Sequence, residues 1–339
     1  MGFIDNEHLQ VNQWARFKTC YAVHTDGDWV TVCRTTRSAK RGAGGLQHQV
    51  IFDEAVTPEL DAWKRCAQIV QAEVADGSAW VAAAVPVHLA ILRKLSAPFP
   101  SVNKALKVFP SLLDIDIPFP LEQCSYAFLD PIKGKDGQVE VNALAVRDTE
   151  LDACLADLEK IDVRPSVVDH EGLALWSQVQ LEQPASDADA ARVLIWIGHS
   201  RTVVVAGQGS RLSHAHTIRV GAESLGQPGA PEKWHTRLQR FLKSLPAEFH
   251  RSKIQFDFVG PGILQVTEIE ELVALVSESN PGLFPPQVVE GSEHVLARAL
   301  STRAMRQSVD PFNFLHGDHE DLALSRARQK RNLRTAITM

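Results

Sequence analysis

The sequence lacks the features by which several classes of protein are recognised. It contains no run of about 18 apolar residues, and residues 1–10 show no basic start followed by an apolar segment, so neither a transmembrane helix nor a signal peptide is predicted. The five cysteines are widely spaced and never form a CxxC pair, which favours a reducing compartment over a disulfide framework or a zinc site. We therefore expect a cytosolic chain.

The sequence also has no excess of positive charge. Its net charge is -6, with 22% charged and 45% hydrophobic residues over 339 positions. This balance is typical of a soluble globular protein with room for two or more packed domains. It gives no reason to expect a nucleic-acid partner.

Strand-like and helix-like segments alternate along the chain, which is typical of the α/β class. Two β-prone runs flank the pair Asp26-Gly27 and predict a hairpin. Thr57 is a predicted N-cap, with Pro58 at the first position of a helix. The other predicted strands are 80–87, 139–146, 163–168 and 254–259, and an antiparallel set at 192–198, 202–206 and 213–220. The other predicted helices are 103–113, 148–160, 234–245, 268–276 and 293–303.

Two groups of polar residues have the composition of a metal site, but solvated loops explain both. Ser200 and Ser210 lie near histidines without a G-x-S-x-G motif around either, so a nucleophilic serine is not supported. We therefore predict neither a metal site nor catalytic residues. The two groups are His199, His214 and His216, and His316, Asp318, His319 and Glu320.

Three segments, residues 109–122, 143–147 and 168–176, read FPSLLDIDIPFPLE, ALAVR and VDHEGLALW. Together they resemble the signature of the type II secretion protein L family (GspL) and its type IV pilus relative PilM. The resemblance covers roughly residues 15–320. It implies an α/β, actin-like (FtsA-like) ATPase fold of two ribonuclease H-like halves with an inserted small subdomain. The implied parts are 15–180, with the insertion at about 100–165; 181–305; and 306–339, a strap with a basic juxtamembrane tail.

The same resemblance places a nucleotide cleft between the two halves. The hairpins at 21–34 and 193–206 fall at the family's phosphate loops, and 258–262 falls at its adenosine loop. A working ATPase of this kind needs acidic side chains at both phosphate loops, whereas His24 and Trp196 stand there. We therefore predict a degenerate cleft without a cofactor, whose glycines serve mainly as turn formers. The residues assigned to it are Asp26, Gly27, Trp196, Gly198, Gly260 and Gly262.

The C-terminal region resembles the segment that joins the body of protein L to its membrane span; in the pilus system the equivalent segment belongs to a separate partner. Exposing each large apolar side chain here would cost about 1.5–3 kcal/mol, so we expect Phe312, Asn313, Phe314 and Leu315 to form a docked strap. A basic run then fits the cytoplasmic flank of a transmembrane helix, although a solvated terminal helix is the alternative. Its charges are Arg326, Arg328, Lys330, Arg331 and Arg334.

The resemblance implies a non-catalytic scaffold at the cytoplasmic face of the bacterial inner membrane. Such a scaffold docks the secretion ATPase GspE and couples it to the platform proteins GspM and GspF, as a monomer or as a homodimer. Two alternatives stay open. One is a PilM-like, ATP-binding adaptor of pilus assembly, and the other is a small-molecule kinase of the same superfamily.

Overall fold

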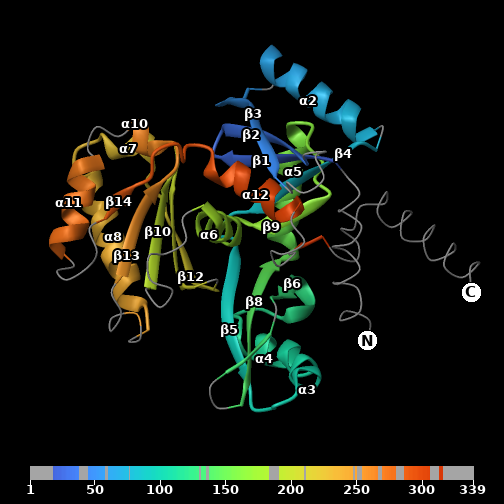
Figure 1. Ribbon diagram of the computed structural model, residues 1–339, viewed down its shortest axis with the longest axis vertical. Coiled ribbons are helices and arrows are strands. Elements are labelled where there is room, and N and C mark those ends of the chain that lie inside the picture. The colour runs from blue at the N-terminus through green and yellow to red at the C-terminus, as the bar shows by residue number, and fades with distance from the viewer. Residues whose placement is uncertain are drawn as a thin grey trace, which may run out of the picture.

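A computed structural model describes thirteen stretches of the chain, which form three β-sheets with helices packed around them (Figure 1). The strands and helices alternate along the sequence, as predicted for an α/β protein. The described residues are 18–37, 45–57, 60–75, 77–129, 131–134, 137–182, 191–209, 211–246, 249, 254–265, 269–279, 286–305 and 313–315.

The first sheet has the strand order β3-β2-β1-β4-β9. Its first three strands form an antiparallel meander, and β4 and β9 then add in parallel. The turn at Gly27 has a positive φ of 64°, which glycine adopts without strain, so the predicted hairpin is confirmed. Helix α2 covers one face through Trp63 and Val70. The bounds are β1 (Thr19–Asp26), β2 (Trp29–Arg37), β3 (Leu46–Ala55), α2 (Asp61–Ala75), β4 (Ala79–Val85) and β9 (Val167–His170).

The second sheet, at the left of Figure 1, repeats this arrangement with the order β12-β11-β10-β13-β14. Strands β10, β11 and β12 are the predicted antiparallel set, and β13 and β14 add in parallel. Helix α8 buries Trp234 and Leu238 against the sheet. The bounds are β10 (Ala191–Ile197), β11 (Thr202–Gln208), β12 (Arg211–Ile218), α7 (Ala222–Leu225), α8 (Ala230–Ser244), β13 (Ile254–Val259), α10 (Gly262–Gln265), α11 (Ile269–Ser279) and β14 (Gln287–Val288).

A third, smaller sheet forms the lower part of the molecule in Figure 1 and follows β4 in the chain. Its strands are antiparallel, and they close a core of their own around Phe109 and Leu113. The chain returns to β9 through α5, whose predicted bounds are confirmed. The bounds are β5 (Ala90–Ala97), α3 (Val102–Leu106), α4 (Phe109–Asp116), β6 (Cys124–Phe128), β7 (Ile132–Lys133), β8 (Val139–Arg147) and α5 (Asp148–Lys160).

Helices α6 (Glu171–Glu182) and α12 (Val295–Met305) pack against each other, and both contact strands of the large sheets. Trp176 of α6 and Leu300 of α12 belong to one buried cluster with Val85 of the first sheet and Leu194 of the second. The two large sheets therefore share a core. Their loops are held at a fixed separation by this packing.

Within the described residues helix α2 begins at Asp61, and its predicted first position, Pro58, lies outside them. One predicted helix differs from the structure. The single helix expected at 103–113 is two helices, because Pro110 lies in the first turn of α4; proline has no N–H to donate and clashes with a preceding helical turn. Strands β3, β5, β6, β7 and β14 were not predicted. Polar residues interrupt the apolar pattern of β3 and β5, β6 has only five residues, and β7 and β14 have two each.

Candidate functional site

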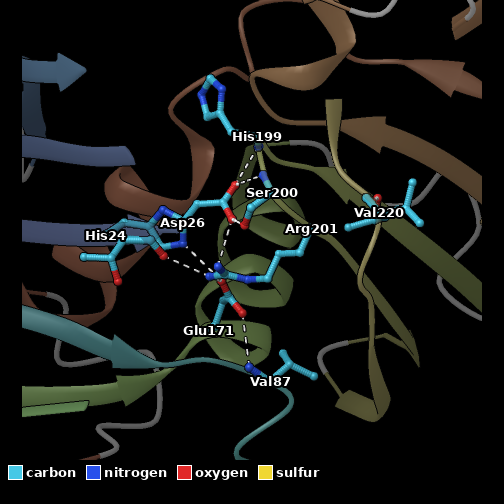
Figure 2. Close-up of polar contacts among 10 residues, drawn as sticks. His24, Asp26, Val87, Glu171, His199, Ser200, Arg201 and Val220 are labelled. Atoms are coloured by element: carbon cyan, nitrogen blue, oxygen red, sulfur yellow. Dashed lines mark hydrogen bonds and ion pairs between the residues drawn. The ribbon is translucent and has the colours of Figure 1, made fainter. Parts of the chain in front are cut away.

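The turn after β10 lies against the end of β1, so the two predicted phosphate loops meet (Figure 2). Asp26 at the end of β1 is only 3% exposed. Its Oδ2 atom accepts backbone N–H groups from His199 at 2.6 Å and Ser200 at 3.2 Å. Its Oδ1 atom accepts the Ser200 hydroxyl and Nη1 of Arg201, the latter at 2.8 Å. One carboxylate therefore binds three consecutive residues of the other loop.

Arg201 continues the network away from Asp26. Its Nη2 atom donates to Oε1 of Glu171 at 2.7 Å and to the carbonyl of Thr25 at 2.9 Å. Glu171, at the start of α6, is 1% exposed and also pairs with Nε2 of His24 at 3.0 Å. Its Oε2 atom accepts the backbone N–H of Val87 at 3.1 Å. We call the set Asp26, Arg201, Glu171, Ser200 and His24 the latch.

The latch keeps opposite charges together inside the protein. Burial alone would raise the pKa of Glu171, but Arg201 and His24 outweigh it and hold that pKa well below its usual range. Burial alone would lower the pKa of Arg201, but Glu171 and Asp26 raise it. Both groups are therefore charged at neutral pH. A buried pair of this kind fixes geometry more surely than it adds net stability.

Trp196 fills the space beside the latch. Its ring is 2% exposed, meets the His24 ring edge-on at 5.3 Å and lies 5.9 Å from the Arg201 guanidinium carbon. A Cβ atom at Gly260 would come within 2.7 Å of Trp196 Cδ1, and one at Gly198 would collide with both Trp196 and Asp26. The close approach of the indole therefore requires glycine at both positions, and the positive φ of 105° favours it at Gly260 as well.

The latch does not fit a bound magnesium nucleotide. Both oxygens of Asp26 are already engaged by four protein donors, and the side chain at the second loop is an indole, which cannot ligate a hard cation. Across the described residues, no group of three or more acidic, histidine or cysteine side chains could hold a metal ion.

The predicted histidine group is divided among separate aromatic contacts. His199 stacks on Trp29 at 3.8 Å, and His216 stacks on Phe241 at 5.6 Å. His214 meets the ring of Phe249 edge-on, and burial lowers the pKa of all three histidines. The second group, residues 316–320, lies outside the described residues.

The described part of the strap, Asn313–Leu315, lies against β9 at the edge of the first sheet. Phe314 is fully buried, and its N–H donates to the carbonyl of Val168 at 2.8 Å. The side-chain oxygen of Asn313 accepts the N–H of Val168 at 2.9 Å. Leu315 is 3% exposed. Phe312 and the basic residues Arg326, Arg328, Lys330, Arg331 and Arg334 lie outside the described residues.

The structure gathers most of the residues that the sequence assigned to the cleft. Asp26 and Trp196 lie at its centre, Gly27 faces Ser200, and Gly198 and Gly260 flank the indole, while Gly262 packs on Ile197. Sequence reasoning missed Arg201 and Glu171. The sequence signal for both was a charged residue beside apolar ones. Arg201 stands between the apolar strands β10 and β11, in the predicted second phosphate loop, and Glu171 stands within the segment VDHEGLALW.

Comparisons with known proteins give matches only among solved structures. No protein-family model matches the sequence, and no curated protein matches it. A PilM-PilN type IV pilus biogenesis complex matches at 17% identity with a TM-score of 0.61, covering 85% of this chain and 98% of that chain.

Two further structures match over similar lengths. One is the cytoplasmic domain of EpsL, an inner-membrane component of the type II secretion system of Vibrio cholerae, at 15% identity and a TM-score of 0.46, covering 89% and 99%. The other is a Bacteroides thetaiotaomicron protein of actin-like ATPase fold and unknown function, at 10% identity and 0.47, with the same coverage. The predicted fold class is confirmed: this chain has an actin-like α/β fold like that of PilM.

Proposed function

We propose that this protein is a non-catalytic scaffold of a bacterial secretion platform. The observation that carries the proposal is the latch: Arg201 and the backbone of residues 199–200 occupy Asp26, where an actin-like ATPase needs a free carboxylate. A fold can persist after its chemistry is lost. What remains is a rigid body with surfaces for partners.

The partners proposed are those of protein L: the secretion ATPase GspE, docked on the body, and the platform proteins GspM and GspF. The strap supports this choice over the pilus system, because residues 313–315 of the same chain pack on the body. No helix within the described residues is long and apolar enough to cross a bilayer. The proposed position at the cytoplasmic face of the inner membrane is supported by the C-terminal basic run.

One observation favours a second function, a PilM-like adaptor that binds ATP. The PilM-PilN complex matches with a TM-score of 0.61, compared with 0.46 for the EpsL domain. Titration calorimetry with millimolar Mg²⁺-ATP separates the two. A scaffold with the latch closed gives no binding heat, whereas a micromolar, Mg²⁺-dependent site supports the adaptor.

The scaffold proposal is tested by mixing the purified protein with the N-terminal domain of its cognate secretion ATPase. We expect the two proteins to co-elute in gel filtration without ATP hydrolysis. The binding should be the same with a non-hydrolysable ATP analogue and with no nucleotide. Separate migration at tens of micromolar, with no calorimetric signal, contradicts the proposal. Co-elution with a pilus partner in place of the secretion ATPase would assign the protein to the pilus system.

A further inference from the structure

Four consecutive residues, Val168–Glu171, contact three different parts of the protein. They join β9 to α6, and each of them is at most 4% exposed. The first binds the strap, the second binds α12, and the fourth belongs to the latch. We call this segment the junction.

The strap end of the junction is Val168. Both of its backbone polar groups bond to the strap: its carbonyl accepts the N–H of Phe314 at 2.8 Å, and its N–H donates to the side chain of Asn313 at 2.9 Å. The strap thus satisfies both backbone groups of Val168 at the edge of the first sheet. Without it, a backbone donor and acceptor at this buried edge would lose their partners, which is costly.

The middle of the junction is fixed to helices on both sides. The carboxylate of Asp169 accepts Nε of Arg303 in α12, and Arg303 Nη1 donates to Ser177 of α6 at 2.7 Å. His170 donates its backbone N–H to Asp169 and accepts the N–H of Leu173 on Nδ1 at 3.2 Å. These hydrogen bonds hold the end of β9 to α6 and α12, so a displacement of Val168 also displaces the start of α6.

The latch end of the junction is Glu171. Its carboxylate binds Arg201 and His24, and Arg201 in turn binds Asp26. The backbone of Glu171 is only three residues from Val168. Packed cores respond to such shifts by moving between discrete arrangements more than by deforming continuously.

We propose that strap docking and latch closure are coupled through the junction, so that the C-terminal segment controls the two facing loops. A seated strap stabilises the closed arrangement of Asp26, Arg201 and Glu171, and release of the strap weakens it. Coupling between two sites is reciprocal, so weakening the latch also loosens the strap. The coupling requires neither a nucleotide nor a partner. Its failure would therefore leave the proposed function unaffected, and failure of the proposed function would leave the coupling unaffected.

The test uses the full chain and hydrogen exchange at named amides. The latch probes are the N–H groups of His199 and Ser200, which bond to Asp26, and the strap probe is the N–H of Phe314. Asn313→Ala removes a strap contact, and Ser200→Ala removes a latch hydroxyl. The control is Ser96→Ala, which removes a hydrogen bond to Gln138 in the third sheet.

We expect Asn313→Ala to speed exchange at the latch probes about fivefold or more, and Ser200→Ala to speed the strap probe by a similar factor. Leu315→Ala, which leaves the Asn313 bonds in place, should act in the same direction as Asn313→Ala. Ser96→Ala should change neither probe. Unchanged exchange at the distant probe in either variant overturns the coupling. An equal rise at amides of the third sheet overturns it too, because it reports a general loss of stability.

Discussion

Asp26 and Arg201 form a buried ion pair at 2.8 Å, although they lie 175 positions apart in the sequence. The pair joins the end of β1 to the loop after β10, one strand from each of the two large sheets. In an ATPase of this fold the same place must stay open to phosphate and metal. Here the protein's own charges close it.

Replacing Arg201 with alanine should strongly destabilise the protein, because Asp26 and Glu171 would be left buried without their cation. Removing one partner of a buried pair costs about 3–5 kcal/mol, and urea unfolding monitored by circular dichroism measures it. The matched control is Arg211→Ala, since Arg211 lies 3.6 Å from Glu140 with 41% of its side chain exposed. Its cost should be at most about 1 kcal/mol. Equal losses in the two variants would contradict this, because they would mean that leaving Asp26 and Glu171 without Arg201 costs no more than breaking an exposed ion pair.

Gly198→Ala should destabilise the protein by about 1–3 kcal/mol. The new methyl group would come closer than 3.0 Å to both Trp196 and Asp26, neither of which has free space to move into. Gly226→Ala is the control, because nothing lies within 4 Å of a Cβ there and its φ of -71° suits any residue. That change should stay within about 0.5 kcal/mol in thermal unfolding. A neutral Gly198→Ala would show that the indole is loosely held.

Mild acid should destabilise the protein through His170. Burial lowers the pKa of this histidine from 6.5 to about 4, so the folded state holds it neutral. The unfolded chain gains the proton first as pH falls, so stability is full above pH 6.5 and decreases toward pH 4 by about 3 kcal/mol from this group. His170→Asn keeps an acceptor for Leu173 and should flatten that part of the curve of unfolding free energy against pH. Parallel curves for the two proteins would assign the acid sensitivity elsewhere.

The C-terminal basic run should bind anionic membranes. Each cation near such a surface contributes about 1 kcal/mol, so changing Arg328, Lys330 and Arg331 to glutamine should weaken co-sedimentation with phosphatidylglycerol vesicles roughly a hundredfold. Salt should weaken wild-type binding as well. The control removes the same charge from α8, at exposed Lys233, Arg237 and Arg240. A larger loss in the α8 variant would place the membrane-facing surface there.

The fold was largely predictable because its strongest local signals survive in the structure. The Asp26-Gly27 turn and the amphipathic pattern of α5 both act over a few residues, and each formed as expected. Strand β3 shows the limit of such signals. Its sequence, LQHQVIFDEA, is a polar run followed by an apolar run without strict alternation, so its pairing with β2 is decided by tertiary contacts.

The latch was harder to predict, because its members are distant in sequence and ordinary in type. His24 was expected to mark a lost acidic site, yet the adjacent Asp26 is the buried acid and is bound by protein donors. Glu171 stands within the apolar segment that carried the family resemblance, but no spacing rule joins it to Arg201. Only the packing of α6 between the sheets brings the two within 2.7 Å.

Helix α12 has a consequence for synthesis of the chain. It contacts β1, β2 and β4, and Met305 near its end shares a buried cluster with Cys20, Trp80 and Ala82 of the first sheet. The ribosome makes roughly 200 residues between β4 and α12, which takes about 10–40 s at bacterial rates of about 5–20 residues per second. During that interval the nascent first sheet has an uncovered apolar face, and a chaperone that binds apolar surface should reach that face before α12 does.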